Sequence, residues 1–452
     1  MGAAIDPTAL DRDVRAAAAR VEKRDAWLRA PLEETRAKAR DFDPFDGLRH
    51  TAGQSTYRAL LELEPNALRD ALLRWVHELL QARIDHELSV DEAEAIHAID
   101  PRLTERQKAA AELPTFADAT RAILTAKTAS LAALALERAG DLAAPVAAVR
   151  RERHARRAEA ARRLGLADAD ALAAPDIDLR ALSRALLDAT EPLSAEILRR
   201  ARREHEGPWT ASSAIQLALA KGARDGWPAH LNARWLDDAF RALAPRAFDP
   251  GPLPAPIGGA TFLRAASQWG AALRSAGAPR STPFAVARDP YPVAAYRFGH
   301  AIATALASPP FQRRVLGLPS RLALAQSRHL RTSMLLHART LAVRVLLASA
   351  APADARVVFE ELTSRLFGAP LPASLEGAWP AARVVDAARI RALLDAHAFV
   401  HQLVDRFDED WFANPKAGAH LASLACGPAF DADPPAEGAP ANVARAFEEA
   451  LG

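Results

Sequence analysis

Helical spacing of apolar residues dominates the first 245 residues, whereas the alternating pattern of a half-buried strand is nearly absent. Between residues 66 and 88, apolar side chains recur three and four positions apart, which places them on one stripe of a helix. These side chains are Leu68, Leu72, Val76, Leu79, Leu80 and Ile84. Half of the 452 residues are hydrophobic, which is enough for a large core. The sequence therefore predicts a mainly α protein and excludes a chain that is disordered throughout.

Proline and glycine divide the chain into two parts. Residues 244–259 carry five prolines and three glycines, and such a segment cannot continue a helix. We expect an N-terminal helical lobe over residues 1–245 and a linker or long surface loop over residues 246–259. A C-terminal helical lobe is then expected over residues 260–452.

A second irregular stretch covers residues 277–292, and its segment Phe284–Ala287 is apolar enough to predict a short strand. Any sheet in the protein is therefore expected to be very small. Helices are predicted to resume at about Val293. Long helices are expected over residues 320–349, 354–367 and 383–408, followed by a tail rich in proline and glycine after Gly427.

Charge and composition exclude several classes of partner. The net charge of +2 is too small to predict binding to nucleic acid or to a membrane surface. The basic runs 150–163 and 199–203 have glutamates nearby, and no aromatic residue interrupts the first run, so solvated helix faces are expected. The single cysteine, Cys426, favours a reducing compartment. With no apolar span and no signal-peptide pattern, we expect a soluble, cytoplasmic protein without nucleic-acid or membrane partners.

One hexapeptide, residues 296–301, carries the most specific motif: Tyr-Arg-Phe-Gly-His-Ala. It resembles the zinc-binding helix of the thimet oligopeptidase and oligopeptidase F family, which reads H-E-F-G-H-A. Tyr296 stands in place of the first histidine and Arg297 in place of the glutamate, while His300 is retained. A Pro-Ser pair at residues 319–320 lies at the distance typical of the family. The resemblance then places the third zinc ligand, a glutamate in the family, at Leu324.

The resemblance implies a large two-lobed helical fold around a cleft, and the substitutions imply that its chemistry is lost. A zinc hydrolase of this kind needs three protein ligands and a carboxylate that takes a proton from water. Phenol is a poor zinc ligand at neutral pH, Arg297 stays protonated, and Leu324 has no donor atom. The family also uses a tyrosine in its C-terminal part, and this chain has no tyrosine after Tyr296.

We therefore predict a pseudoenzyme without a catalytic residue and without a cofactor, one that binds a peptide or a partner protein. An active peptidase paralogue is one candidate partner, because related subunits already have complementary surfaces. If Leu324 points into the former zinc site, then Arg328 and Arg331 flank it with Arg297 opposite, beside His300. Such a cleft suits an acidic peptide tail or another anion. The alternative is that these arginines pair with local acids or lie on the surface.

Two other histidine patterns suggest different chemistry. His397 and His401 lie one helical turn apart with Asp405 one turn further, which is good geometry for one divalent metal in a relocated enzyme site. The alternative is a pair of core histidines with hydrogen-bonded partners. His77-Glu78-Leu79-Leu80-Gln81 misses the H-E-x-x-H pattern at its last residue, so His77 is interpreted as an ordinary helix residue. A helical scaffold protein without any such site is the remaining alternative.

Overall fold

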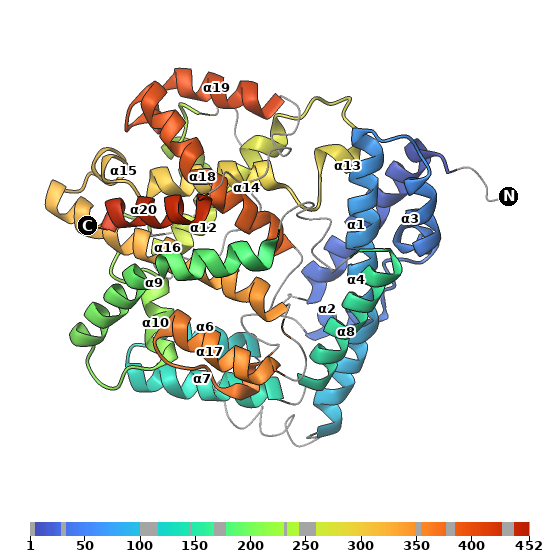
Figure 1. Cartoon of the computed structure of the whole chain (residues 1–452), viewed down its shortest axis with the longest axis horizontal. Helices are drawn as coiled ribbons and strands as arrows, with labels where there is room; N and C mark the ends of the chain where they lie inside the picture. The colour runs from blue at the N-terminus through green and yellow to red at the C-terminus, as the bar shows by residue number, and fades with distance from the viewer. Residues whose placement is uncertain are drawn as a thin grey trace. The chain divides into compact units, whose positions relative to one another are not determined.

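The computed structural model of the chain describes residues 5–28, 33–99, 116–144, 147–166, 178–229, 233–243, 259–348, 350, 354–376, 385–426 and 438–451. Within these ranges every regular element is an α-helix or a 3-10 helix, so the predicted mainly α class is confirmed (Figure 1). None of the helices in these ranges is long and apolar enough to cross a membrane.

Packing divides the chain into two compact units, each built from three segments. The first unit contains residues 1–109, 145–175 and 279–292, and the second contains residues 110–144, 176–278 and 293–452. The sequence suggested a linear division at residues 246–259. All but the last residue of that segment lie outside the described residues, so its role as a linker stays a prediction.

The first unit is organised around a long helix, α4 (Ala67–Ile99), with α1 (Pro7–Leu28) and α8 (Ala147–Arg163) packed against it (Figure 1). The predicted stripe of α4 faces the core, where Leu72, Val76 and Leu79 are fully buried. The unit also contains α2 (Glu33–Asp41), η1 (Arg49–Ala52), α3 (Gln54–Leu61) and α13 (Phe284–Ala287).

The predicted strand at Phe284–Ala287 is wrong, because these residues form the single helical turn α13. The backbone N–H groups of Phe284 and Ala285 donate to the carboxylate of Asp11 at 3.0 and 2.7 Å, which satisfies the donors at the start of the turn. Trp75 donates its indole N–H to the carbonyl of Ala285 at 3.3 Å. These partners lie more than 200 residues away in sequence, so the local pattern could not reveal them.

The basic run 150–163 lies in α8 and forms ion pairs along the helix, as its charge pattern predicts. Arg156 pairs with Glu152, and Arg163 pairs with Glu159 at 3.0 Å. Pairs spaced by four residues satisfy such charges without any other molecule.

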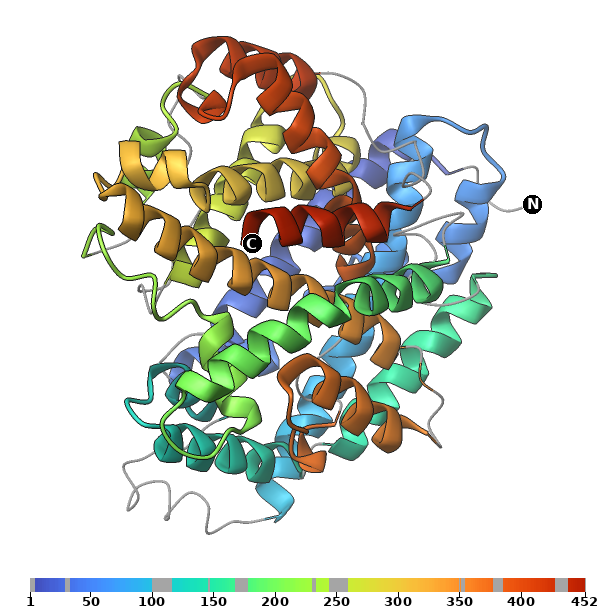
Figure 2. The ribbon, with the colours of Figure 1, turned by 60° about the vertical axis from the view of Figure 1, so that its left-hand side comes forward.

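The second unit holds the remaining helices. They are α6 (Phe116–Thr125), α7 (Ala129–Ala143), α9 (Leu179–Glu204), α10 (Ala211–Ala218), α11 (Ala233–Ala239), α12 (Gly259–Ala276), α14 (Val293–Leu306), α15 (Pro309–Arg314), α16 (Ser320–Ala348), α17 (Ala355–Phe367), η3 (Ala373–Leu375), α18 (Val385–Phe407), η4 (Trp411–Ala413), α19 (Pro415–Cys426) and α20 (Ala439–Leu451). Figure 2 shows α9, α16 and α20 packed side by side.

Helix positions in this unit agree with the sequence pattern except at the end of the chain. The predicted start at Val293 and the long helices over 320–349, 354–367 and 383–408 are confirmed by α14, α16, α17 and α18. The tail after Gly427 is not irregular throughout, because α20 forms there. Its residues Val443 and Phe447 are fully buried and hold it on the core.

Backbone contact fixes the packing of α12 against α14. A Cβ atom on Gly270 would lie 2.7 Å from the carbonyl oxygen of Phe298, and one on Gly299 would lie 2.5 Å from that of Ser267. Glycine at both positions therefore lets the two helices approach more closely than any other residue would allow. α18 packs on α14 as well, through Phe298 and Phe399 at a centroid distance of 5.6 Å.

Candidate functional site

The hexapeptide motif lies at the start of α14, and the residues that match the family sequence are those that pack. Phe298 is 3% exposed and Ala301 is 1% exposed, while Gly299 forms the close contact with α12. The residues that differ, Tyr296 and Arg297, carry the polar groups. The residues that match the motif are therefore ones that pack in the core, whereas Tyr296 and Arg297 differ from it.

Arg297 is held in an ion pair with α18. Its Nη2 lies 3.0 Å from Oδ2 of Asp395, and the two side chains are only 9% and 19% exposed. At low exposure a guanidinium paired to a carboxylate is a fixed structural group, and a charged arginine cannot accept a proton from water. Arg297, which stands where the resembled motif has its glutamate, therefore forms half of an ion pair.

Tyr296 lies under a guanidinium from α18. Arg389 sits 5.2 Å from the ring centroid of Tyr296, within the range of a cation–π contact, and it also donates to Asp386 at 3.2 Å. Asp386 is 1% exposed and forms a second ion pair with Arg344 at 3.6 Å. One buried carboxylate at the first turn of α18 thus serves two arginines.

His300 matches the second histidine of the motif that the hexapeptide resembles, and its surroundings are cationic. Burial lowers the pKa of His300 to about 4, the charge of Arg389 acts in the same direction, and a hydrogen bond to the Arg389 backbone opposes both. The imidazole is therefore neutral at pH 7, and it still keeps part of its surface exposed.

Two further histidines lie within electrostatic reach of His300. Burial lowers the pKa of His337 to about 3, and the charges of His300, Arg344, Arg389 and Arg264 lower it further. The side chain of His337 is nevertheless exposed to water. Burial also lowers the pKa of His397 to about 3, with Arg331, His300 and His401 contributing. We refer to His300, Arg331, His337, Arg389 and His397 as the Arg/His cluster.

Helix α16 runs antiparallel to α14, and this direction decides which of its residues lies near His300. Ser327 donates to the carbonyl of Ala307 at 2.5 Å, and Arg331 donates to that of Thr304 at 3.2 Å. Higher residue numbers on α16 therefore meet lower numbers on α14, which brings His337 toward His300.

Leu324 lies toward the other end of that contact, and it is 45% exposed. Of the predicted cleft residues, Arg331 and His300 belong to the Arg/His cluster, whereas Arg328 is exposed and Arg297 is paired with Asp395. The sequence missed Asp395, Arg389 and His337 as site residues. The spacing of the family motif predicted position 324 as the third ligand position. No local sequence pattern indicates which residues of α16 or α18 lie near α14.

The predicted metal set on α18 is spread along the helix surface. His401 and Asp405 are exposed, whereas His397 packs edge-on against Phe447 at a centroid distance of 5.3 Å. In the described part of the chain, no three His, Cys, Asp or Glu side chains are grouped so that they could hold a metal ion. The relocated metal site stays a prediction that a measurement of metal content decides.

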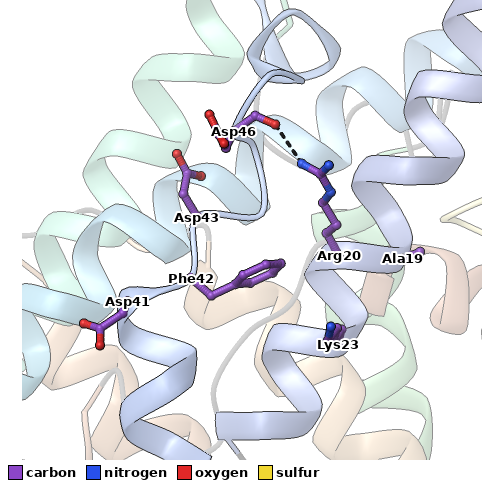
Figure 3. Close-up of a pocket in the computed structure, with 7 residues that line it drawn as sticks. All are labelled: Ala19, Arg20, Lys23, Asp41, Phe42, Asp43 and Asp46. Atoms are coloured by element: carbon purple, nitrogen blue, oxygen red, sulfur yellow. Dashed lines mark hydrogen bonds between the residues drawn. The ribbon is translucent and has the colours of Figure 1, made fainter.

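A pocket of about 720 Å³ lies in the first unit, between α1 and the segment that follows α2. Figure 3 shows Arg20 of this pocket donating to the carbonyl of Asp46, at 2.7 Å. Lys23 lies over the rings of Trp27 and Phe42 at 4.7 and 5.8 Å. The lining also includes Asp41 and Asp43, so charges of both signs are present and no single ligand chemistry is favoured.

The first unit also holds a buried polar network on α4. His77 is fully buried, its Nδ1 lies 2.7 Å from the hydroxyl of Tyr291, and its Nε2 lies 3.4 Å from the side-chain nitrogen of Gln81. The Tyr291 hydroxyl donates to Glu78 at 3.3 Å. Burial, aided by the charge of Arg157, lowers the pKa of His77 to about 4. Burial raises the pKa of Glu78. Both ring nitrogens of His77 have partners within the unit.

Comparison with known proteins finds no matching protein-family model and no matching curated protein. Among solved structures, the chain is similar to one described as an oligoendopeptidase F. The two share 12% sequence identity with a TM-score of 0.48, over 100% of this chain and 97% of that chain.

Proposed function

We propose that this chain is a catalytically inactive, metallopeptidase-like protein that binds a peptide or a partner protein. The observation that carries the proposal is the ion pair between Arg297 and Asp395, because it occupies the position where the zinc helix needs a free carboxylate. Tyr296 under Arg389 and Leu324 on an exposed surface agree with it.

The residues of the motif that build the fold are kept, whereas most of those that would perform the chemistry are replaced. The motif residues that pack the core, Phe298, Gly299 and Ala301, match the zinc helix of the family. The residues that would bind zinc or activate water do not, apart from His300. An active peptidase paralogue in the same cytoplasm is the partner we propose, since paired subunits of one family share complementary surfaces.

Metal content and peptide hydrolysis test the inactivity together. Tag-free protein, purified without chelator and dialysed against trace zinc, is expected to hold far less than one metal ion per chain by elemental analysis. It is also expected to leave unstructured fluorogenic peptides intact. Chelator-sensitive hydrolysis that disappears in His300→Ala would contradict the proposal. Metal that is lost in His397→Ala would instead support the relocated site on α18.

The partner is tested separately. Purified chain and purified active paralogue are mixed and resolved by size-exclusion chromatography with light scattering, and one complex of defined stoichiometry is expected. If the two proteins elute separately at micromolar concentration, the paralogue is not the partner. A peptide then remains as the proposed ligand.

A further inference from the structure

Helix α16 presents an exposed face over its first turns. Four exposed side chains follow one another at spacings of three, one and three residues: Arg321, Leu324, Ala325 and Arg328. Such spacing places them on one side of a helix. We call these four residues the α16 stripe. Leu322 lies beside the stripe and is 37% exposed.

The α16 stripe has an apolar centre between two cations. Leu324 is 45% exposed at this centre. Arg321 and Arg328 are roughly 10 Å apart along the helix axis, because each of the seven residues between their positions rises about 1.5 Å. A partner that covers Leu324 can therefore also reach a guanidinium group on either side of it.

The sequence around the stripe lacks acidic residues. Residues 290–353 include eight arginines and neither aspartate nor glutamate, although acidic and basic residues are nearly equal in number over the whole chain. Within the described ranges, Arg321 forms no ion pair. The local sequence thus supplies no carboxylate to pair with it.

Acidic residues of two other segments approach this end of α16. Asp225 comes near, because its backbone N–H and C=O are bonded to the side chain of Gln326, and the exposed Arg224 precedes it. On α15, Arg314 is ion-paired with Asp410, and the two residues before Asp410 are also acidic. Helix α15 therefore meets charges of both signs, and we confine the surface to α16 itself.

Hydrogen bonds on the opposite side hold this end of α16 in place. Gln326 donates to the carbonyl of Asp225 at 2.9 Å and to the side-chain oxygen of Gln312 at 2.7 Å. Ser327 donates to the carbonyl of Ala307 at 2.5 Å. Because these contacts already fix the helix, a partner that docks on the stripe has little ordering of the backbone to offset.

We propose that the α16 stripe is a docking surface for an acidic amphipathic helix of a partner protein. The inference rests on the proposed binding function and names the chemistry of the partner segment. Two carboxylates about two helical turns apart would pair with Arg321 and Arg328, and an apolar side chain between them would pack on Leu324. Opposite charge and a shared apolar centre make the two helix faces complementary.

The composition of the surface favours a protein over other anionic partners. Residues 312–358 contain no phenylalanine, tyrosine or tryptophan, so the stripe offers no stacking platform for nucleic-acid bases. A helix that lies on a membrane buries a broad apolar face, whereas this one exposes only Leu322 and Leu324 as large apolar side chains.

The test titrates the full-length chain against a fluorescein-labelled peptide by anisotropy at low salt. The probe has three repeats of Glu-Gln-Ala-Leu-Gln-Ala-Gln, which places glutamates seven residues apart with a leucine between them. One control peptide carries serine in place of leucine, and another carries lysine in place of glutamate. We expect the first peptide to bind, the serine peptide to bind about tenfold more weakly, and the lysine peptide not to bind.

Variants of the chain locate the binding. Leu324→Ser removes the apolar contact and is expected to weaken the complex by about tenfold. Arg321→Gln removes one exposed ion pair and is expected to weaken it by about threefold. Leu131→Ser on α7 and Arg356→Gln on α17 are the matched controls, since both replace exposed residues of the same unit, and they are expected to bind as the wild type does.

Each other outcome overturns the inference. If the wild type does not bind the probe, or if the serine peptide or the control variants give the same affinities as their counterparts, the stripe is not the docking surface. Sedimentation with vesicles of phosphatidylcholine and phosphatidylserine, abolished by Leu324→Ser, would assign the stripe to a membrane surface. A dimer in light scattering that Leu324→Ser dissociates would show that a second copy of the chain covers it.

Failure of this inference is distinct from failure of the proposed function. All four substituted side chains are exposed, so the variants are expected to fold, and thermal unfolding verifies this. A chain that leaves the probe unbound and also lacks hydrolytic activity loses this surface and remains inactive. A chain that hydrolyses peptides in a chelator-sensitive way loses the proposed function whatever the probe does.

Discussion

Histidines with low pKa values occur in both units, but their surroundings differ. In the first unit, His77 is fully buried, and both of its ring nitrogens lie within reach of partners, Tyr291 and Gln81. In the second unit, His300, His337 and His397 keep part of their surface exposed and face arginines. The same direction of pKa shift therefore accompanies a closed hydrogen-bond network in one region and an open, cationic surface in the other.

The difference separates structural polar groups from groups that can bind. A buried polar group that is fully hydrogen-bonded contributes to stability, and its removal leaves its partners unsatisfied. A group with spare donors and access to water contributes little to stability and remains available to a ligand. Stability measurements and binding measurements should thus respond to different histidines.

The largest expected effect on stability comes from substitution of His77. Substitution His77→Ala leaves a cavity and removes one hydrogen-bond partner of the Tyr291 hydroxyl, and we expect it to lower the free energy of unfolding by about 3 kcal/mol. The paired variant His337→Ala is expected to change it by less than about 0.5 kcal/mol. Urea unfolding followed by circular dichroism measures both, and equal losses in the two variants would contradict the distinction.

The next effect compares two arginines within the second unit. Arg297→Ala removes the ion pair from the half-buried carboxylate of Asp395 and is expected to cost about 2 kcal/mol. Arg331→Gln breaks one hydrogen bond to a backbone carbonyl and is expected to cost less than about 1 kcal/mol. The denaturant concentrations at the midpoint of unfolding, compared for variants whose transitions have the same m-value, give both free-energy changes. The reverse order would identify Arg331 as the structural residue and Arg297 as the one available for binding.

The third effect is a change in how stability depends on pH. Folded His77 stays neutral down to pH about 4, whereas the unfolded chain takes up that proton near pH 6.5, so this group destabilises the fold as the pH falls through that range. Glu78 has a raised pKa and acts in the opposite direction, because the folded state keeps its proton above the ordinary value of 4.5.

Removal of Glu78 should therefore expose the effect of His77. In Glu78→Gln, stability is expected to fall more steeply between pH 6.5 and 4.5, by at most about 1.4 kcal/mol per pH unit. Thermal melts at half-unit intervals of pH compare this variant with the wild type. Parallel stability curves would mean that the two titrations do not oppose each other.

Most of the helices were predictable, because residues close to each helix end determine where the helix begins and ends. The starts of α14 and α16 and the end of α17 follow from apolar periodicity and from the proline or glycine beside them, and the end of α18 follows from apolar periodicity alone. The turn at Phe284–Ala287 was not predictable, since it is capped by Asp11 from the other end of the sequence. Helix α20 was not predicted, because the proline-rich sequence before it suggested an irregular tail.

The candidate site was predictable only in part. The motif on α14 pointed to Tyr296, Arg297 and His300, and the charge of Arg297 argued against a general base from the sequence alone. The partners of these residues could not be predicted, because Asp395 and Arg389 come from α18 and their proximity depends on tertiary packing. Position 324 was chosen by spacing, yet the antiparallel course of α16 carries it away from His300.

The contact of Gly270 and Gly299 with the opposing backbone has a consequence for how such a chain can evolve. The spacing of α12 and α14 is set by main-chain atoms, so it does not depend on which side chains the rest of α14 carries. On a helix, position 297 points nearly opposite to position 299 and position 300 points about a quarter turn away, whereas position 296, three residues before 299, lies nearer to its face. Substitutions at 297 and 300 can therefore accumulate without disturbing the contact that spaces the two helices.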